Sequence, residues 1–154
     1  MLEVWDKYTE ESMYMVYGDI SKFIYYNILG LGCKKILDVG CNIGMELNSF
    51  PKDIDLTGID INESALKLAE ERLPFKFKYA DVTDLPIPDN YYDMVFDRGL
   101  LIHLEDVDKA MNEMLRVSKK YVMNLEYYGE DGKKIEWRGG SPLFYRNMKD
   151  RWKS

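Results

Sequence analysis

The chain has 154 residues, of which 46% are hydrophobic and 31% are charged, and this is enough for one globular domain with a buried core. Its formal net charge of −6 argues against a nucleic-acid groove, in which basic residues should cluster. Two cysteines are too few for a disulfide framework or a zinc site, and no long apolar run or charged leader indicates a membrane span or export. We therefore expect a cytoplasmic protein with no bound metal and no nucleic-acid or membrane partner.

Residues 1–34 predict a helical region with a break near Gly18. Its apolar residues recur at intervals of three and four and form one stripe, which consists of Met13, Val16, Ile20, Phe23, Ile24 and Ile28. Asp19 is a candidate N-cap for a second helix, which should end at Gly30 or Gly32. The aromatic side chains of this region either pack over the sheet edge or contact a ligand.

The stretch Lys35–Gly44, KILDVGCNIG, predicts a buried strand over Ile36–Val39, a tight glycine turn and a short helix over residues 45–50. Gly40 and Gly44 would permit positive φ and let a ligand approach the backbone closely. The loop is also expected to present the free N–H groups of the helix N-terminus to that ligand. The alternative is a glycine turn of the kind that any α/β protein needs after its first strand.

A second apolar strand, Asp55–Ile61, brings Asp60 to its end, twenty residues after Gly40. An acid at this point of a strand–loop–helix–strand unit can accept hydrogen bonds from both hydroxyls of a ribose. The alternative is a role at the N-terminus of the next helix, which Asn62 can already cap.

Charge indicates which ribose ligand fits the glycine loop. A dinucleotide brings a pyrophosphate, for which the loop needs a glycine at the point of close approach and no nearby anion. Asn42 stands in the place of that glycine, and Asp38 puts a carboxylate directly before the turn. This carboxylate would repel phosphate but attract an ammonium group. S-adenosylmethionine (SAM) has an ammonium group, a ribose diol and no phosphate, so the loop favours SAM over NAD.

The next elements bring a further acid to the same edge of the sheet. Asn62 is predicted to cap a helix over Glu63–Leu73, whose buried face consists of Ala65, Leu66, Ala69 and Leu73. Phe75–Tyr79 alternates with a period of two, which predicts a strand near a sheet edge. Asp81 follows that strand and could either cap the next turn or contact a ligand. Residues 85–90 then predict a rigid loop.

Tyr92–Phe96 predicts the fourth strand, and Asp97 and Arg98 directly follow it. Arg98 either binds an anionic group of a ligand or forms a structural ion pair with Asp97. His103 is the only histidine and lies just beyond. It is either a general base or a packed residue with a backbone hydrogen bond.

The helix that begins at Asp106 has the clearest apolar face, formed by Val107, Ala110, Met111, Met114 and Leu115. Tyr121–Leu125 predicts the fifth strand. Glu126, Tyr127 and Tyr128 emerge at its carboxyl end, where a carboxylate and two phenols could hold a polar substrate.

The C-terminal part is short for the strands that it should contain. Glu130–Lys133 is typical of a hairpin turn, which predicts that Leu125–Tyr128 folds against Lys134–Trp137. Leu143–Trp152 predicts a short amphipathic tail. An exposed sheet edge would then need a cover, and a homodimer through that edge is one hypothesis.

The segments ILDVGCNIG, TGIDINESAL, ADVTDLPIPDNYYDMVFDRGLLIHL and AMNEMLRVSKKYVMNLEYY resemble the ordered motifs of class I SAM-dependent methyltransferases, from about Lys34 to Tyr128. The shorter segments GMELN, RGLLIHL, LRVSKKYVMNLEYY, WRGG and LFYR resemble the methylases associated with the biosynthesis of pseudaminic acid, a bacterial sugar. The resemblance implies an α/β fold, with a Rossmann-like, doubly wound, mainly parallel sheet in the order 3-2-1-4-5. A full class I domain has two further strands, so the C-terminal part would be reduced. The ligand crevice of such a sheet lies between strands 1 and 4, where Asp97 and Arg98 face Gly40.

The resemblance also implies a domain organisation and a set of site residues. One domain, residues 1–154, would comprise an N-terminal helical lid (1–34), a Rossmann-like core (35–128) and a shortened C-terminal part (129–154). Tyr8 or Tyr17 of the lid could stack near the sulfonium. Asp81 would accept a hydrogen bond from the adenine amino group, and the Val82 N–H would donate to the ring. The expected cofactor-binding residues are Asp38, Gly40, Cys41, Asn42, Gly44, Asp60, Ile61, Asp81, Val82, Asp97 and Arg98. The expected substrate-binding residues are Glu126, Tyr127 and Tyr128, and His103 is the candidate catalytic residue.

Three functions are compatible with these features. The first is a SAM-dependent methyltransferase that acts on an oxygen or nitrogen of a small polar acceptor, for which a sugar or sugar nucleotide is a candidate. It needs no general base if positioning and desolvation supply the acceleration. The second is a non-catalytic SAM-binding module or partner subunit, which the reduced C-terminal part suggests. The third is an NAD-dependent dehydrogenase, which Asp38 and Asn42 disfavour.

Overall fold

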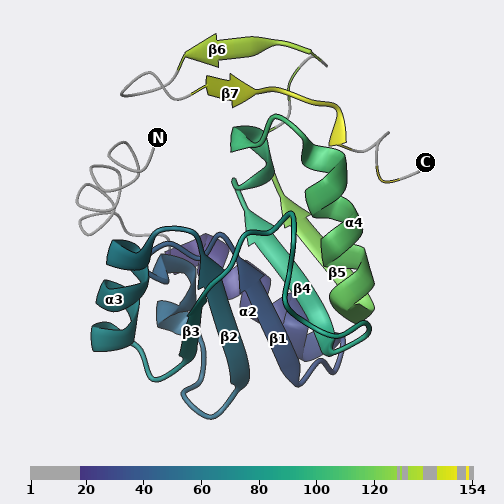
Figure 1. Cartoon of the computed structure of the whole chain (residues 1–154). Helices are drawn as coiled ribbons and strands as arrows, with labels where there is room; N and C mark the ends of the chain where they lie inside the picture. The colour runs from purple at the N-terminus through teal and green to yellow at the C-terminus, as the bar shows by residue number, and fades with distance from the viewer. Residues whose placement is uncertain (1–17, 128, 130–131, 137–141, 149–151, 153–154) are drawn as a thin grey trace.

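The computed structural model describes residues 18–127, 129, 132–136, 142–148 and 152, and Figure 1 shows their arrangement. The helices in these ranges are α2 (Gly18–Gly30), α3 (Glu63–Arg72) and α4 (Val107–Val117), with the 3₁₀ helices η1 (Met45–Ser49) and η2 (Leu101–His103). The strands are β1 (Lys35–Val39), β2 (Asp55–Asp60), β3 (Lys76–Tyr79), β4 (Tyr92–Arg98), β5 (Ser118–Leu125), β6 (Lys134–Glu136) and β7 (Pro142–Phe144).

The central sheet confirms the predicted fold class. Its five strands follow the order β3-β2-β1-β4-β5, and every neighbouring pair is parallel. β1 pairs with β2 on one side and with β4 on the other, so the strand order reverses at β1. In a doubly wound sheet, ligands bind outside the carboxyl ends of the strands at this reversal. The ends of β1, β2 and β4 are therefore the place to look for a site.

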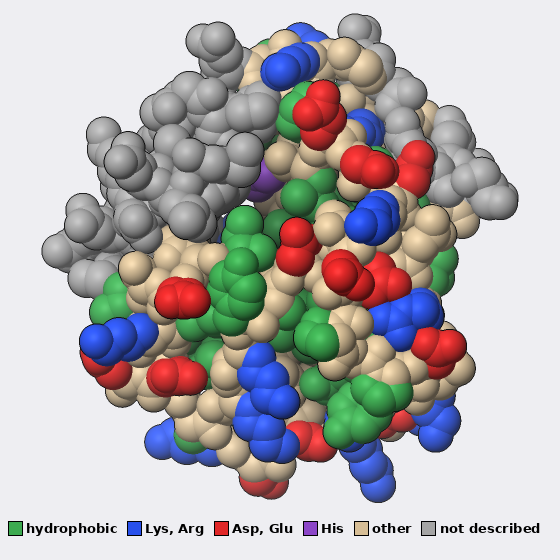
Figure 2. Space-filling model, in the orientation of Figure 1, with side chains coloured by type: hydrophobic (Ala, Val, Ile, Leu, Met, Phe, Trp, Pro, Cys, Tyr) green, Lys and Arg blue, Asp and Glu red, His purple; other side chains and the backbone are tan. Residues whose placement is uncertain are grey.

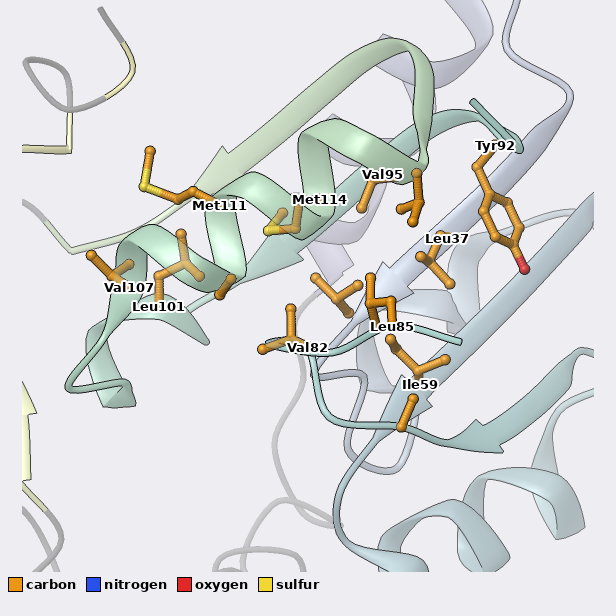
Figure 3. Close-up of a cluster of buried hydrophobic side chains, with 14 residues drawn as sticks. Leu37, Ile59, Val82, Leu85, Tyr92, Val95, Leu101, Val107, Met111 and Met114 are labelled. Atoms are coloured by element: carbon orange, nitrogen blue, oxygen red, sulfur yellow. The ribbon is translucent and has the colours of Figure 1, made fainter. Parts of the chain in front are cut away.

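Helices cover both faces of the sheet, and each face has its own apolar core. α4 lies over β4 and β5 on one face, and α2 lies behind the opposite face (Figure 1). In the α4-side core, Figure 3 shows Leu37 and Val95 of the strands beneath Met114 of α4. The α2-side core includes Ile36. Because neighbouring side chains of a strand point to opposite faces, Asp38 shares the α2 side with Ile36.

Local structure differs from the sequence-based expectation in several places. The short helix after the glycine loop is a 3₁₀ helix, η1. β4 extends two residues further than expected and therefore includes Asp97 and Arg98, and β5 begins three residues earlier, at Ser118. The Asn62 side chain caps α3 as predicted, by accepting from the Ala65 N–H. The Asp106 side chain likewise caps α4, by accepting from the Lys109 N–H, and the helix begins at the next residue.

The predicted apolar stripes of α2 and α4 are partly wrong. Ile24 and Ile28 of α2 are fully buried, but Phe23 is 55% exposed. Ile20 is 39% exposed, and Met13 and Val16 lie outside the described residues. In α4, Leu115 is 51% exposed, because the buried face continues through Met114 to Val117 instead.

The C-terminal strands pair differently from the prediction. β6 and β7 form a separate antiparallel pair in which Ile135 lies opposite Leu143. β5 instead stays paired with β4 up to its end, where the Gly99 N–H donates to the Leu125 carbonyl at 2.9 Å. The expected pairing of Leu125–Tyr128 with Lys134–Trp137 is therefore wrong for the residues that the structure describes. Tyr128, residues 130 and 131, and Trp137 lie outside them.

The described residues that follow β7 pack on the α4 side of the sheet. Arg146, which follows β7, is 8% exposed and donates hydrogen bonds to the carbonyls of Leu101 and Leu104 in and after η2. Met148 and Trp152 pack against the α4-side core. The predicted amphipathic tail thus does bury apolar side chains, while its first residues form β7.

The surface of the described part is mixed in charge. Figure 2 shows acidic and basic side chains interspersed over the face in view, with hydrophobic side chains between them. In the described part of the chain, every helix is too short or too polar to span a membrane.

Candidate active site

The glycine loop after β1 adopts the backbone that its sequence predicts. Gly40 and Gly44 have φ values of 72° and 71°, in the left-handed region that glycine enters without strain. Asn42 has φ 47°, which asparagine tolerates better than most residues. A Cβ atom at Gly40 would lie 2.8 Å from the Leu100 Cδ1 atom. Glycine is therefore needed here because the β4–η2 connection packs directly onto the loop.

The N–H groups of loop residues 40 to 44 all have acceptors within the protein, whereas the free N–H groups expected at the N-terminus of the following helix, η1, remain a prediction. The Gly40 and Cys41 N–H groups both donate to the Ile59 carbonyl, and the Asn42 N–H donates to the Asp60 carboxylate. The Ile43 N–H donates to the Asn42 side chain, and the Gly44 N–H donates to the Cys41 carbonyl. The loop folds against the end of β2, which supplies the first three acceptors. A pyrophosphate needs several free backbone donors, so this geometry disfavours a dinucleotide.

Asp60, at the end of β2, holds the loop in place. One of its carboxylate oxygens accepts from the Asn42 N–H at 2.8 Å, and the other accepts from the Asn62 N–H at 2.9 Å. Burial raises the pKa of Asp60, and these backbone hydrogen bonds oppose that rise. A carboxylate oxygen can accept more than one hydrogen bond, so each oxygen retains capacity for a ligand hydroxyl.

Asp38, near the end of β1, is a buried acid that fits a cation. The residue is 3% exposed, and its Oδ2 atom has no hydrogen-bond partner within the described part of the chain. Burial raises the pKa of Asp38 well above the usual carboxyl range, and the carboxylates of Glu46, Asp97 and Asp60 raise it further. A buried acid with an unsatisfied oxygen is costly, and an ammonium group would both neutralise and hydrogen-bond it.

Arg98 pairs with a residue that the sequence did not suggest. Its guanidinium forms an ion pair with Glu46 of η1, and both side chains are largely buried. The positive charge also lowers the pKa of Asp38, although burial outweighs this effect. Of the two predicted roles, anion binding remains a prediction, and the ion pair that the structure shows is with Glu46 rather than Asp97.

Asp81 adopts the turn-capping role that was the alternative to ligand binding. Its Oδ1 atom accepts from the N–H and the hydroxyl of Thr83, both at 2.8 Å. The side chain is exposed at the carboxyl end of β3, so contact with an adenine remains a prediction. Val82 is buried in the α4-side core, and Ile61 is 37% exposed beside Asp60.

On the α4 side, two acids from neighbouring strand ends come together. Asp97 of β4 is fully buried, and its Oδ1 atom accepts from the Asn124 side chain at 2.5 Å. Glu126, just after β5, accepts from the N–H groups of Leu101 and Ile102 at 2.6 and 3.2 Å. The carboxyl groups of Asp97 and Glu126 also interact with each other. Glu126 therefore joins the end of β5 to η2 and to β4.

The two carboxyl groups cannot both be ionised without a large cost. Burial and the neighbouring Asp97 carboxylate raise the pKa of Glu126 to about 9. Burial likewise raises the pKa of Asp97, against its hydrogen bonds from Glu126 and Asn124. Like charges at such short range favour one shared proton, so the pair holds a single negative charge near neutral pH.

Replacing Glu126 by Gln should flatten the pH dependence of stability. Because the pKa of Glu126 is raised from 4.5 to about 9, the folded state binds the extra proton. The stabilising effect of this proton is complete below the ordinary pKa of 4.5 and is lost as the pH rises towards the raised pKa of about 9. The expected slope is at most about 1.4 kcal/mol per pH unit. Urea denaturation of both proteins at several pH values measures it.

The control for this experiment is Glu71→Gln, which removes an exposed carboxylate on α3. It should leave the wild-type slope unchanged. If Glu126→Gln has the same slope as the wild type between about pH 6 and about pH 8.5, the raised pKa is disproved.

A cavity of about 650 Å³ opens at the carboxyl ends of β4 and β5. Its walls come from α2, η2, β6 and β7 as well as from these two strands, and its polar lining includes Arg98, His103, Asn124, Glu126, Tyr127 and Tyr145. This volume suits a small organic molecule. Of the three predicted substrate residues, Glu126 and Tyr127 line the cavity, and Tyr128 lies outside the described residues.

His103 lines the same cavity from η2. Burial lowers its pKa to about 4, so the imidazole is neutral at physiological pH. A neutral imidazole can accept a proton, but with this pKa it is a weak base. Its catalytic role therefore remains a prediction.

The structure thus divides the predicted site residues into two groups. The loop residues with Asp38 and Asp60 lie at the ends of β1 and β2, and the cavity residues lie at the ends of β4 and β5. Sequence reasoning missed Glu46, Asn124 and Arg146, whose partners are distant in the chain. Glu46 and Arg146 belong to the segments GMELN and LFYR, whose resemblance to known methylases implies no role for either residue.

These features define an α/β domain of the Rossmann-like type whose glycine loop favours an adenosyl ligand without phosphate. A family model described as a methyltransferase domain matches residues 37–121. The chain therefore belongs to the methyltransferase domain family.

Among curated proteins, ajmaline N-methyltransferase of Rauvolfia serpentina is 35% identical over 94 residues, which cover 55% of this chain and 32% of that protein. The ubiquinone/menaquinone biosynthesis C-methyltransferase UbiE of Burkholderia cenocepacia is 36% identical over 104 residues, which cover 60% of this chain and 43% of that protein. The matched region thus spans about a third to two-fifths of the length of these relatives.

Solved structures show the same fold. Phosphoethanolamine N-methyltransferase 2 of Haemonchus contortus, in complex with SAM, superposes with a TM-score of 0.64 at 20% identity, over 78% of this chain and 31% of that one. The [4+2]-cyclase SpnF superposes with a TM-score of 0.68 at 24% identity, over 83% of this chain and 51% of that one. Since a cyclase shares the fold, the fold alone does not fix the reaction.

Proposed function

We propose that this chain binds SAM and transfers its methyl group to an oxygen or nitrogen of a small polar acceptor. The observation that supports the proposal most strongly is the pair of acids at the ends of β1 and β2, of which Asp38 is buried and Asp60 is partly buried. Asp38 has an unsatisfied oxygen next to a loop whose N–H groups are already used. Membership of the methyltransferase domain family and the methyltransferase names of the curated relatives point the same way.

The residues present fit SAM better than a dinucleotide. Asp38 would bind the ammonium of the methionine part, and Asp60 would accept from the ribose hydroxyls. Asp81 and the backbone of Val82, which follow β3, would contact the adenine. SAM, when bound, supplies a methyl group that is already activated by the sulfonium.

The chain's own residues contribute positioning and the exclusion of water. The Leu100 side chain packs onto Gly40 of the glycine loop. Glu126 accepts a hydrogen bond from the Leu101 N–H of η2, and Arg146 donates one to the Leu101 carbonyl. The two residues thereby hold η2 in place. Positioning of this kind accounts for a large part of the acceleration in bimolecular transfer.

The acceptor belongs in the cavity at the ends of β4 and β5. Its walls combine apolar side chains with Asn124, Glu126 and Tyr127, which suits a small molecule with a few hydrogen-bonding groups. A sugar or sugar nucleotide is the candidate that follows from the segments resembling the pseudaminic acid-associated methylases. The curated relatives include N- and C-methyltransferases, so the acceptor panel should contain amines as well as sugars.

Calorimetry with SAM, S-adenosylhomocysteine and NAD tests the cofactor. We expect both adenosyl ligands to bind and NAD to show no heat of binding, because the loop has no free donors between residues 40 and 44. Binding of NAD in preference to SAM would refute the proposal.

Turnover distinguishes an enzyme from a binding module. Release of S-adenosylhomocysteine should be measured with panels of sugars, sugar nucleotides and small amines. Release that depends on one class of acceptor supports the methyltransferase. Tight binding of SAM without release, across all classes, would favour the non-catalytic alternative. The domain division, the cytoplasmic location and a homodimer remain predictions alongside these tests.

A further inference from the structure

The connection between β3 and β4 begins with a tight turn at the carboxyl end of β3. The Asp84 N–H donates to the Asp81 carbonyl at 3.0 Å, which closes the turn over residues 81–84. Directly before the turn, the Ala80 N–H donates to the Asp60 carbonyl at 3.1 Å and so ties the chain to the end of β2. The turn carries Asp81 and Val82, the two residues that would contact the adenine of SAM in the proposed function.

Arg116, in the last turn of α4, binds the part of this connection that follows the turn. Its guanidinium donates to the carbonyls of Leu85 and Ile87 at 2.9 and 2.7 Å. It also donates to the Asp89 carboxylate at 2.7 Å, and the Arg116 carbonyl accepts from the Asn90 N–H at 2.8 Å. Because the donors of a guanidinium have a fixed planar geometry, this one side chain sets the positions of several loop groups at once.

Glu113, three residues earlier on α4, completes the contact. Its carboxylate accepts from the Leu85 N–H at 2.7 Å and from two nitrogens of Arg116, both at 2.7 Å. The Glu113 and Arg116 side chains are 18% and 32% exposed, so solvent competes only in part for these hydrogen bonds. Leu85 is therefore held at its N–H and at its carbonyl, and its buried side chain shares the α4-side core with Val82 (Figure 3).

The turn over residues 81–84 thus lies between two fixed points, Ala80 and Leu85. A loop that is fixed before its ligand binds loses less conformational entropy on binding than a loop that must first become ordered. Hydrogen bonds to the edge of an adenine also depend on direction, and they weaken steeply when donor and acceptor are misaligned. The position of Leu85 therefore influences how well Asp81 and Val82 can contact an adenine.

We infer that Glu113 and Arg116 are positioning residues for the adenine of SAM, because they hold the turn over residues 81–84 in place. This inference rests on the proposed function and adds two residues of α4 to it. Both side chains act through Leu85 and not by contact with the ligand. Loss of their hydrogen bonds should therefore weaken the recognition of the adenine more than the recognition of the rest of SAM.

The test compares two ligands that differ only in the base, S-adenosylhomocysteine and S-inosylhomocysteine. The base of the inosyl ligand carries a carbonyl oxygen in place of the amino group of adenine, and an N–H in place of a ring acceptor. Both contacts expected of Asp81 and Val82 are therefore lost with the inosyl ligand. In calorimetry, we expect the wild-type protein to bind the adenosyl ligand about tenfold or more tightly than the inosyl ligand.

Substitutions of Arg116 should reduce this preference. Arg116→Met removes every guanidinium donor, and Arg116→Lys keeps the charge but has one donor nitrogen in place of three. Each variant should bind S-adenosylhomocysteine about fivefold or more weakly than the wild type, while its affinity for S-inosylhomocysteine changes by less than about twofold. The control is Ile28→Val, which shortens a fully buried side chain of α2 on the opposite face of the sheet. It should lower the stability but keep the full preference.

Hydrogen exchange of the ligand-free proteins tests the contact itself. The Leu85 N–H donates to Glu113, and the Thr83 N–H donates to Asp81 within the turn. In Arg116→Met, the exchange of these two amides should accelerate about tenfold or more relative to the amides of β1, because the connection opens locally. A purely global loss of stability, as expected for Ile28→Val, would accelerate the exchange of all these amides together.

The outcomes distinguish failure of the inference from failure of the proposed function. If the wild type prefers the adenosyl ligand and both Arg116 variants keep the full preference, only the inference is wrong. An equal loss of affinity for both ligands would show a merely structural role and would also overturn it. If the wild type binds both ligands equally well, the adenine contacts in the proposed function are wrong, and the inference is wrong with them. If S-adenosylhomocysteine does not bind at all, the proposed function itself is wrong.

Discussion

Asp38→Asn should weaken SAM binding about tenfold to a hundredfold and at the same time make the unliganded protein more stable. The substitution keeps the shape of the side chain but removes its charge. Hydrogen bonds to charged groups contribute roughly 1.5–3 kcal/mol, and this is the expected loss towards an ammonium. Calorimetry with SAM measures the affinity, and thermal unfolding without ligand measures the stability.

The gain in stability follows from the surroundings of Asp38. Burial and the carboxylates of Glu46, Asp97 and Asp60 raise its pKa well above the ordinary value. An acid with a raised pKa stabilises the folded state below its unfolded pKa and loses this effect as the pH rises through the folded pKa. Asparagine has no such loss, so the variant should gain more stability at about pH 8 than at about pH 6.

Asp53→Asn is the matched control for this prediction. Asp53 is exposed in the loop before β2, at the end of the sheet opposite the glycine loop. The same change of charge should leave the SAM affinity unaltered there. If Asp38→Asn binds SAM as tightly as the wild type does, the buried carboxylate has no part in recognition and the proposed orientation of the ligand is wrong.

Arg146→Met should destabilise the protein by about 3 kcal/mol, because one buried and three part-buried carbonyls lose their donor. The Arg146 guanidinium donates to the carbonyls of Leu101, Phe144, Leu104 and Glu105 at 3.2, 3.3, 2.6 and 2.9 Å. Methionine keeps much of the packing volume but cannot donate. Each buried acceptor left unsatisfied costs roughly 1–3 kcal/mol, and water can reach part of this site.

Urea denaturation measures the effect of Arg146→Met on the free energy of unfolding. Arg72→Met is the control, since Arg72 is exposed in the last turn of α3, and it should change the stability by less than about 0.5 kcal/mol. If Arg146→Met lowers the free energy of unfolding by less than about 1 kcal/mol, this residue does not stabilise the contact between β7 and η2.

The fold could be read from the sequence because its signals are local and periodic. The strand over Ile36–Val39, the glycine turn and the acid at Asp60 each depend on residues close in the chain. The order of the sheet came from the resemblance that these segments carry together. The predicted ends of the strands were less accurate where a strand continues beyond its apolar residues, as β4 does through Asp97 and Arg98.

The site could be predicted in its residue types but not in its contacts. The glycine loop looked like a source of free N–H groups, yet the Ile59 carbonyl and Asp60 carboxylate of another strand occupy three of them. Similarly, nothing near Arg98 in the chain indicates its ion pair with Glu46, which lies in η1, 52 residues away in the sequence. The pairing of β6 with β7 was missed because a turn signal does not show which strand lies beyond it.

Asp97 and Arg98 are adjacent in β4, yet one bonds to Asn124 on the α4 side and the other pairs with Glu46 of η1. In the proposed function, β4 would lie between the binding site of the methyl donor and the cavity for the acceptor, which Arg98 also lines. Substitutions on β5, η2 and β7 would then change the choice of acceptor, while Asp38 and Asp60 lie at the ends of β1 and β2.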